Sequence, residues 1–452
     1  MKLAFFVSQF PIRSQTFVLN QITGLIDAGI DISIISLGVG DKTLFNERDY
    51  LTYQLAARTH YLTPPALMAP LVKFKHRLIK TLFGLVHPKT SKRTVKALTT
   101  KALGKPAQRL LLAAIAAQTK NTYQFDVILA HFGDNGITAN NLRTLNVLQG
   151  KLVTVFHGYE LSVKQTLLAN RANYQRLFAQ GELMLPISEI WQEKLIKIGC
   201  SSDKVRVHRM GVDLTHFPYQ RALNTVLRSI ELTKTPPVLT LFTVARFTQK
   251  KGIIYALEAL ALVLGLTKTK AKTQQFPLNS PQKADSAEQP ILCHYRLAGF
   301  GEELGAIKQA IDDLGLSPFV TLLGPLNSAQ VQEELIHADV FLQPSITANN
   351  GDMEGIPVSI MEAMAVGTVV LSTYHSGIPE LITHGEQGLL APEKSSLSLA
   401  DNIRLLYHDI PLREKLTANA RQKIAQVGDV KTLNKQLLDI LNVVLSQTDK
   451  KH

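Results

Sequence analysis

Two carboxylates stand on either side of a predicted helix start in the segment 351–367. Pro357 fits the first position of that helix, and Gly367 fits the residue just past its end. Glu354 therefore precedes the helix, whereas Glu362 lies inside it. Because the first turn of a helix has free N–H groups and the positive end of the helix dipole, the loop that holds Glu354 favours an anionic ligand. Taken alone, the segment is equally consistent with a simpler interpretation. Glu362 would then be a solvent-exposed helix residue, and Glu354 would only stabilise the start of the helix.

An arginine and a lysine form the second candidate site, in the segment 244–252. The segment follows an apolar run and precedes a helical pattern at 253–264. In a doubly wound sheet, ligands bind beyond the carboxyl ends of the strands, where such a loop lies. Arg246 and Lys251 would bind two phosphates there, the guanidinium through its planar fork and the ammonium as a point charge. The alternative is that both are ordinary solvent-exposed residues of a turn.

The elements that must position these residues are short apolar runs that alternate with helical patterns. Most of the runs are continuous, as in strands that helices cover on both faces. They form two successive sets of six, which predicts an α/β protein with two doubly wound domains, at 1–218 and 219–452. The expected strands are 3–7, 32–37, 127–130, 152–156, 184–186 and 205–208 in the first domain, and 238–244, 293–298, 320–323, 340–342, 368–372 and 389–391 in the second.

The two candidate sites together resemble the retaining glycosyltransferases of the large family 4, which have the GT-B fold. The shared pattern is Arg-x4-Lys-Gly, here Arg246 to Gly252, followed further along the chain by Glu-x7-Glu, here Glu354 to Glu362. The resemblance implies two Rossmann-like domains that face each other across a cleft, with helices at the C-terminus. It also implies that Arg246 and Lys251 bind the donor diphosphate and that Glu362 accepts hydrogen bonds from the nucleotide ribose.

The same resemblance implies that the donor sugar lies against the loop before the helix, at Gly355, Ile356 and Pro357, and that Glu354 is catalytic. Glu354 acts either as a nucleophile or as an electrostatic stabiliser, and both remain open. The resemblance implies no metal ion, because fixed cationic side chains and backbone amides stabilise the charge of the departing diphosphate instead. Asp352 and Glu354 superficially resemble the acidic metal motif of another transferase class, but the two-domain pattern favours the metal-free class.

A further match lies at 154–160, where a predicted strand end is followed by His-Gly-Tyr-Glu. The family has His-Gly-x-Asp at this place, and the resemblance implies that His157 is a catalytic residue that contacts the donor sugar. Glu160 stands in place of the usual aspartate. In the first loop, Ser14 and Thr16 are candidates to bind the donor or the acceptor, although Ser14 fits a helix cap equally well. This loop, which lacks the glycine pair of many members, is similar to that of the subgroup of colanic acid and exopolysaccharide transferases.

The reaction that the resemblance implies is transfer of a sugar from a UDP- or GDP-linked donor, without a cofactor. The implied acceptor is a polyprenyl-diphosphate-linked oligosaccharide of exopolysaccharide, capsule or lipopolysaccharide biosynthesis. The alternatives are a GT-B epimerase and a catalytically silent sugar-nucleotide-binding scaffold at the membrane. The presence of both donor motifs favours the transferase. Neither the donor sugar nor the acceptor linkage follows from these motifs, because differences of one hydroxyl decide them.

The net charge of +13 originates in one segment of the chain. Residues 51–125 contain thirteen Lys and Arg and no Asp or Glu, and the rest of the chain is formally neutral. From Pro70, a helical pattern places Lys73, Arg77 and Lys80 opposite an apolar face formed by Leu71, Phe74, Leu78, Leu82, Leu85 and Val86. This basic element, about 66–120, predicts contact with an anionic membrane surface, whereas the alternative is an ordinary helix with a wet face. Nucleic acid is not an expected partner, because few aromatic residues lie between the basic ones.

The composition indicates the cellular compartment of the protein and distinguishes one unusual segment. Cys200 and Cys293 lie too far apart in sequence to suggest a disulfide framework, and no run of 18 apolar residues predicts a membrane span. We therefore expect a cytoplasmic protein, peripheral on the inner face of the membrane. The segment 267–290 is polar and punctuated by prolines, which predicts a disordered insertion rather than a specificity loop.

Overall fold

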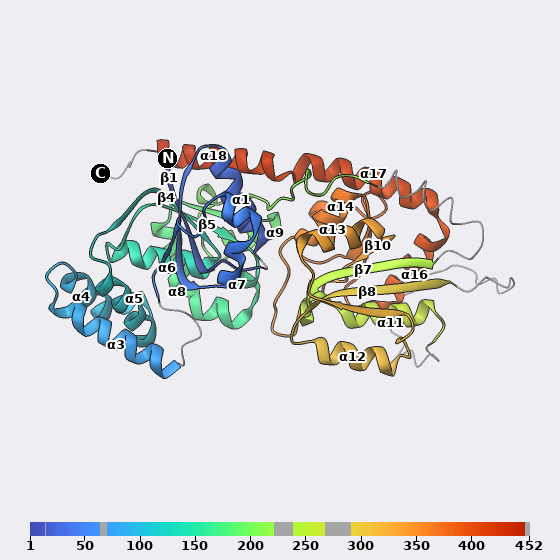
Figure 1. The fold of residues 1–452 in the computed structure, drawn as a ribbon, viewed down its shortest axis with the longest axis horizontal. Coiled ribbons are helices and arrows are strands. Elements are labelled where there is room, and N and C mark those ends of the chain that lie inside the picture. Colours follow the sequence, from blue (N-terminus) through green and yellow to red (C-terminus); the bar gives the residue numbers. More distant parts are fainter. Residues whose placement is uncertain (14, 64–69, 221–237, 267–290, 448–452) are drawn as a thin grey trace. The chain divides into compact units, whose positions relative to one another are not determined.

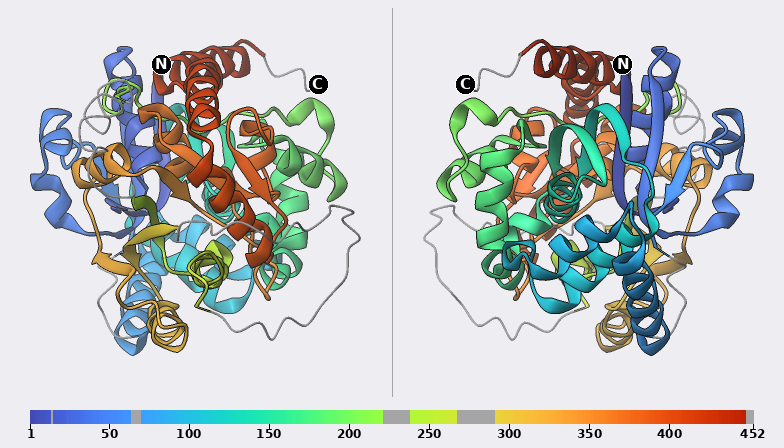
Figure 2. Two further views of the ribbon diagram at one scale, coloured as in Figure 1. Left: turned by 90° about the vertical axis from the view of Figure 1, so that its right-hand side faces the viewer. Right: turned by 90° about the vertical axis from the view of Figure 1, so that its left-hand side faces the viewer.

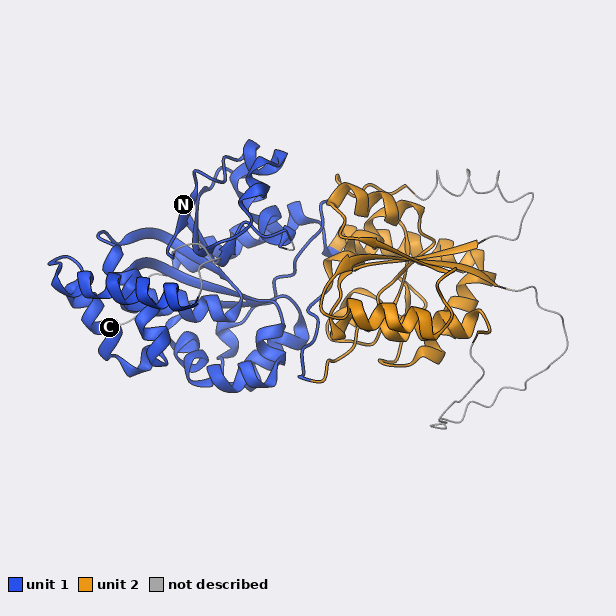
Figure 3. Ribbon diagram, turned by 60° about the horizontal axis from the view of Figure 1, so that its bottom comes forward, with its two compact units in different colours: residues 1–213, 350–356, 427–452 blue, residues 214–349, 357–426 orange. Residues whose placement is uncertain are grey.

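The computed structural model describes residues 1–13, 15–63, 70–220, 238–266 and 291–447. The chain divides into two compact units (Figure 3), of which the first comprises 1–213, 350–356 and 427–452, and the second 214–349 and 357–426. Ser14 and the predicted insertion 267–290 lie outside the described residues.

The first unit contains a parallel sheet of six strands in the order β3-β2-β1-β4-β5-β6 (Figure 1). The strands are β1 (Lys2–Phe10), β2 (Asp31–Val39), β3 (Thr59–Tyr61), β4 (Tyr123–His131), β5 (Leu148–Phe156) and β6 (Leu183–Pro186). The helices are α1 (Thr16–Asp27), α2 (Arg48–Thr52), α3 (Pro70–Val86), α4 (Ser91–Thr99), α5 (Pro106–Gln118), α6 (Gly133–Thr144), α7 (Tyr159–Ser162), α8 (Lys164–Gln180), α9 (Glu189–Lys197) and α18 (Val430–Ser446).

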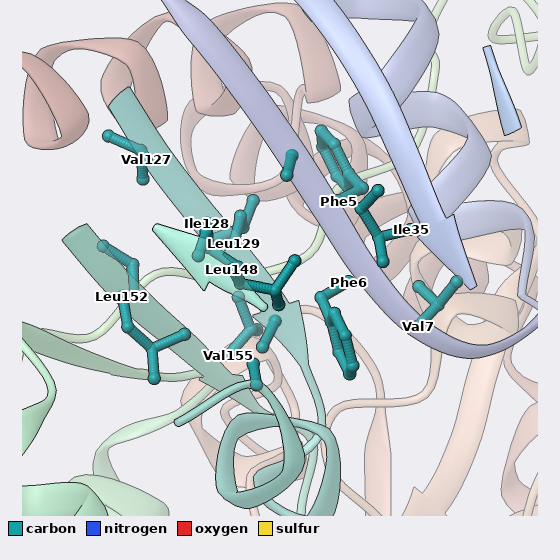
Figure 4. Close-up of a cluster of buried hydrophobic side chains, with 14 of the residues drawn as sticks. Phe5, Phe6, Val7, Ile35, Val127, Ile128, Leu129, Leu148, Leu152 and Val155 are labelled. Carbon is teal, nitrogen blue, oxygen red and sulfur yellow. The ribbon is translucent and has the colours of Figure 1, made fainter. Parts of the chain in front are cut away.

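Continuous apolar runs form the central strands of this sheet, as expected for strands covered on both faces. Phe5, Phe6 and Val7 of β1 pack beside Val127–Leu129 of β4 in one buried cluster (Figure 4). Five of the six strands predicted in this half are therefore confirmed. The predicted strand at 205–208 is wrong, because Val205 makes only a single bridge to Met184. The edge strand β3 was missed because Thr-His-Tyr forms no apolar run.

The second unit contains a second parallel sheet of six strands, in the order β12-β11-β10-β7-β8-β9. The strands are β7 (Val238–Arg246), β8 (Leu292–Phe300), β9 (Val320–Gly324), β10 (Val340–Leu342), β11 (Val369–Thr373) and β12 (Leu389–Ala391). The helices are α11 (Ile253–Val263), α12 (Leu304–Asp313), α13 (Ser328–His337), α14 (Val358–Val366), α15 (Ile378–Leu381), α16 (Ser396–His408) and α17 (Ile410–Val427). All six strands predicted in this half are present, so the prediction of two doubly wound α/β domains is confirmed.

Helices α3, α4 and α5 pack against one another in the first unit (Figure 1). Helix α3 begins at Pro70, as predicted, but only Thr81 and Gly84 are buried. Its large apolar side chains are exposed instead, namely Leu71, Val72, Phe74, Leu78, Ile79, Leu82, Phe83 and Val86. The apolar face therefore points away from the domain, which is the reverse of an ordinary domain helix with a wet face.

The last helix of the chain, α18, completes the first unit. It packs against α1 and β4, and both views of Figure 2 place it beside the N-terminus. Leu437 and Leu441 are fully buried in the same core as β1. The side-chain amide of Asn434 donates a hydrogen bond to the carbonyl oxygen of Asn20 at 3.2 Å. Residues from the two ends of the chain thus share one hydrophobic core.

Candidate active site

A pair of histidines lies at the carboxyl ends of two neighbouring strands in the first unit. His131 is the last residue of β4, and His157 directly follows β5. Because the two strands are parallel and adjacent, the histidines meet at one edge of the sheet. His131 Nδ1 and His157 Nε2 are 3.1 Å apart and share a hydrogen bond, whose donor depends on the tautomers. The predicted catalytic histidine is therefore held by a second histidine.

Two phenylalanines pack against the ring of His157. The ring centroid of Phe132 lies 4.3 Å from that of His157, and the centroid of Phe17 lies 4.8 Å away. Phe132 occupies the left-handed region, with φ of 75°, which few residues other than glycine adopt. Strain of this kind persists only where the surrounding structure imposes it, and it often occurs near functional sites. The orientation of His157 is thus restrained by packing against two aromatic rings.

Burial keeps both histidines neutral. Desolvation, followed by the nearby His208, lowers the pKa of His131 to about 3. Desolvation also lowers the pKa of His157 well below its ordinary value, and the neighbouring His131 adds to this effect. His157 is therefore suited to exchange a hydrogen bond with a hydroxyl group at neutral pH, rather than to act as an imidazolium acid.

Glu160 supports the backbone around this pair. Its Oε1 accepts hydrogen bonds from the backbone N–H of His157 at 2.8 Å and of Gly133 at 3.2 Å. The side chain is fully buried, and desolvation raises its pKa to about 7 although these two hydrogen bonds oppose the rise. The longer glutamate therefore connects the loop after β5 to the first residue of α6.

The segment 350–356 lies against the loop of His157 within the same unit. The N–H of Met353 donates to Ser162 Oγ at 3.1 Å. A Cβ added to Gly355 would lie 2.3 Å from Ile187 Cδ1 and 2.5 Å from the carbonyl oxygen of His157. No side chain fits at this position, so glycine is required by close packing. Gly355 thus directly adjoins the backbone of His157.

The remaining predicted residues of this unit lie at the same sheet edge or in this segment. Glu354 and Ile356 are buried. Thr16 is exposed and is the first residue of α1, one position before the Phe17 that packs on His157. The predicted cap residue Ser14 lies outside the described residues, and Gln15 occupies the N-cap position of α1 without a side-chain cap.

The predicted diphosphate-binding residues lie at the carboxyl edge of the second sheet. Arg246 is the last residue of β7, and Lys251 ends the 3₁₀ turn η4 (Gln249–Lys251) before α11. The side chain of Arg246 is 68% exposed and lies 3.7 Å from Glu302, which is 60% exposed. Such a solvated ion pair does not hold Arg246 strongly. Gly252 has a φ of 64°, and a Cβ there would lie 1.9 Å from the carbonyl oxygen of Pro344. This glycine therefore lets the turn approach the loop that follows β10.

The helix α14 starts at the end of that loop. Pro357 is the residue before the helix, one position earlier than predicted, whereas Gly367 caps its end in the left-handed region as expected. Since β10 is the neighbour of β7, the amino end of α14 and the turn of Lys251 follow adjacent strands. The N–H of Ile346 donates to the carbonyl oxygen of Lys250 at 2.8 Å, which ties the two loops together. Glu362 lies in the second turn of α14, and burial raises its pKa to about 7.

Comparisons with known proteins agree with this architecture. A family model described as glycosyl transferases group 1 matches residues 280–423. The chain is 39% identical to the putative colanic acid biosynthesis glycosyltransferase WcaL of Salmonella typhimurium, over 98% of this chain and 100% of that protein. It is 41% identical to the amylovoran biosynthesis glycosyltransferase AmsK of Erwinia amylovora, over 88% of this chain and 89% of that protein. The chain belongs to the group 1 glycosyltransferases. The expected resemblance to the colanic acid and exopolysaccharide subgroup is thereby confirmed.

Solved structures show the same fold. HepE of Anabaena, crystallised in complex with UDP-glucose, superposes with a TM-score of 0.65 at 19% identity and covers 98% of this chain and 100% of that one. Sucrose-phosphate synthase of Thermosynechococcus elongatus superposes with a TM-score of 0.67 at 15% identity, over 99% of this chain and 100% of that one. Two doubly wound domains of the GT-B type are therefore confirmed for this transferase.

The structure brings the predicted residues together in two groups, one in each unit. His157, Glu354, Gly355, Ile356 and Thr16 lie in the first unit, and Arg246, Lys251, Pro357 and Glu362 lie in the second. Sequence reasoning missed His131, although a signal was present, because His131 and His157 both follow an apolar run by one position. Among the described residues, no group of three or more His, Cys, Asp or Glu side chains is placed to hold a metal ion.

Proposed function

We propose that this transferase moves a sugar, with retention and without a metal ion, from a UDP- or GDP-linked donor to a polyprenyl-diphosphate-linked oligosaccharide in exopolysaccharide biosynthesis. The observation that carries the donor half is the position of Arg246 and Lys251 after β7, whose neighbour β10 is followed by the loop that leads to the amino end of α14. A guanidinium, an ammonium and free helix N–H groups at one sheet edge are what a diphosphate needs. The relatives WcaL and AmsK, which are named for exopolysaccharide biosynthesis, support the pathway.

The proposed chemistry assigns a role to each group. As the bond to the sugar breaks, negative charge develops on the departing diphosphate, and Arg246, Lys251 and the first turn of α14 stabilise it. Positive charge develops on the sugar, where Glu354 acts as a stabiliser or as a nucleophile. The neutral ring of His157 forms a hydrogen bond with a sugar hydroxyl. The carboxylate of Glu362 accepts hydrogen bonds from the ribose, and those bonds favour its ionised form.

The membrane half of the proposal rests on helix α3. Its exposed apolar side chains include Phe83 at 68% and Val86 at 79% exposure, in a segment that carries no acidic residue. A helix with an uncovered apolar face and many neighbouring cations is typical of binding in the plane of an anionic bilayer. No helix among the described residues combines the length and the apolar character needed to cross a bilayer. We therefore propose that α3 docks the enzyme at the cytoplasmic face, where a lipid-linked acceptor is accessible.

Donor binding tests the first half. Arg246→Ala and Lys251→Ala should each weaken binding of UDP or GDP by about tenfold or more, because a charge-assisted hydrogen bond contributes about 1.5–3 kcal/mol. Lys308→Ala removes an exposed cation from α12 of the same unit and serves as the matched control. Equal affinities in all three variants would contradict the assignment.

Product analysis tests the reaction itself. A panel of nucleotide sugars with lipid-linked acceptors should give a product whose anomeric configuration matches the donor, and activity should persist in excess chelator. Inversion would reject the retaining mechanism, and loss of activity that divalent cations restore would reject metal independence. Glu354→Gln removes the carboxylate charge that both proposed roles of Glu354 require, so substantial remaining activity would exclude an essential ionic role of either kind.

Vesicle binding tests the membrane half. Replacing Phe83 and Val86 together with serine should abolish co-sedimentation with anionic vesicles and leave UDP binding intact. The control is Leu168→Ser, which removes an apolar side chain of 73% exposure from α8 of the same unit. Equal vesicle binding by both variants, or binding that ignores the charge of the lipid, would refute docking by α3.

A further inference from the structure

A small cavity lies beneath α3 at the carboxyl edge of the first sheet. Its volume is about 200 Å³, and it is lined by Ser8 and Gln9 of β1, Gln118 of α5, and Lys73, His76 and Arg77 of α3. Gly38, Thr63 and apolar side chains from β2, α5 and the residue after β3 complete its wall. Among the described residues that line it, none is acidic.

The packing of α3 explains why cations line this cavity. A Cβ added to Gly84 would lie 2.2 Å from Ala117 Cβ, so the helix approaches α5 closely at this glycine. Lys73, Arg77 and Gly84 fall at positions i, i+4 and i+11 and therefore share one face of the helix. When Gly84 and Thr81 are buried against the neighbouring helices, the two cations of this face turn inward over the sheet edge. The apolar residues are then left on the outer face.

The chemistry of the lining selects a compact anion. A guanidinium fork, an ammonium and two carboxamides bind phosphate oxygens well. The volume is smaller than the roughly 300–1,000 Å³ of pockets that enclose a whole drug-sized ligand, so the cavity matches a small group better than a whole sugar nucleotide. A phosphate or diphosphate group fits this size, and the apolar part of the wall allows an attached hydrocarbon chain.

We propose that this cavity binds the diphosphate of a prenyl-linked acceptor. The proposal rests on the proposed function, since it names where the acceptor of that reaction is held. The apolar face of α3 enters the bilayer, while its inner face presents Lys73 and Arg77 to the diphosphate at the level of the headgroups. One helix thus binds the membrane and recognises the lipid-linked substrate with opposite faces.

Binding of farnesyl diphosphate, a short and soluble prenyl diphosphate, to the full chain tests this proposal. The double variant K73Q/R77Q should weaken binding at least tenfold, and the milder His76→Gln should weaken it less. The matched control K89Q/K92Q removes the same charge from exposed residues of the same acid-free segment and should bind as the unchanged protein does. Tryptophan fluorescence of Trp191, which is buried in this unit, confirms that each variant is folded.

The outcomes separate the possible sources of the anion. The proposal would be overturned if K73Q/R77Q and the control K89Q/K92Q lost equal affinity for farnesyl diphosphate. It would also be overturned if neither K73Q/R77Q nor His76→Gln lost any. Inorganic diphosphate or phosphatidylglycerol vesicles that compete as strongly as farnesyl diphosphate would overturn the assignment to a prenyl-linked ligand. UDP binding, which depends on residues of the second unit, should be unchanged in K73Q/R77Q. Loss of farnesyl diphosphate binding with normal UDP binding therefore supports the cavity, whereas failed UDP binding by the unchanged protein refutes only the proposed function.

Discussion

Replacing Glu160 with glutamine should remove a pH-dependent loss of stability from the first unit. Glu160 is fully buried, and its Oε1 accepts two backbone hydrogen bonds that a glutamine oxygen can also accept. Its Oε2 has no hydrogen-bond partner among the described residues, so the new amide NH₂ adds a penalty that does not vary with pH. The substitution therefore isolates the ionisation of this one group.

The magnitude follows from the raised pKa. Burial raises the pKa of Glu160 from 4.5 to about 7, so the folded protein retains this proton to a higher pH than the unfolded chain does. Between pH 4.5 and pH 7 the folded state holds more protons, and the free energy of unfolding must fall as the pH rises. At about 1.4 kcal/mol per pH unit, the total loss is about 3 kcal/mol, and it levels off above pH 7. In the glutamine variant this fall is absent.

Urea denaturation followed by fluorescence at several pH values measures this effect. Trp191 is the one tryptophan of the chain and lies buried in the first unit beside Gly158, so its emission reports this unit rather than the other. Glu160→Gln should gain about 2.5 kcal/mol in free energy of unfolding relative to the unchanged protein between pH 5 and pH 8, since part of the total change lies below pH 5. The lowered pKa values of the buried histidines affect both proteins alike and cancel in the difference.

The control is Glu193→Gln, which neutralises an exposed carboxylate on α9 of the same unit. Its stability relative to the unchanged protein should vary little over the same pH range. A flat difference between the Glu160 variant and the unchanged protein from pH 5 to pH 8 would refute the reasoning, because it would mean that burial does not hold the proton on Glu160.

Three further substitutions test the packing of the first unit by the same fluorescence assay. Gly355→Ala should lower the free energy of unfolding by about 1–3 kcal/mol, because its Cβ would lie 2.5 Å from the His157 carbonyl oxygen. The control Gly38→Ala in β2 of the same unit, where the nearest atom would lie 3.6 Å from the new Cβ, should have a far smaller effect, and similar effects would contradict the close-packing argument. Leu437→Ala in the buried face of α18 should lower the free energy of unfolding by about 2–5 kcal/mol. Val443→Ala, which removes a side chain that is 51% exposed, should lower it far less. Lys151→Met should lower the free energy of unfolding by about 1 kcal/mol, because Lys151 Nζ donates a hydrogen bond to the Val444 carbonyl at 2.9 Å near the end of α18. An unchanged urea midpoint would show that this hydrogen bond contributes nothing to stability.

The sheets were largely predictable from the sequence because their strands are buried on both faces. A run such as Phe5–Val7 must be apolar throughout, whatever its neighbours are, so composition alone reveals it. β3 escaped prediction because it is short, lies at the edge and contains polar residues. Arg246 and Lys251 lie between a strand and a helix, as their spacing in the sequence predicted, and their role in donor binding stays a prediction.

Other features depend on contacts that a linear pattern does not contain. The partnership of His131 and His157 requires the knowledge that β4 and β5 are neighbours. The periodicity of α3 revealed two faces but not which one is covered, since Gly84 rather than a large apolar residue sets the packing. The membership of α18 in the first unit also escaped prediction, because its amphipathic pattern fits either domain.

The place of α18 has a consequence for the order of events during synthesis. The ribosome completes residues 1–213 long before it reaches Val430, so the nascent first unit lacks one wall of its core. At a synthesis rate of about 5–20 residues per second, this gap lasts roughly 10 to 40 s. During that time the apolar surface that Leu437 and Leu441 later cover is open to water and to other chains. The domain that is synthesised first therefore completes its core last. A nonsense mutation just before α18 would leave the N-terminal domain without part of its core.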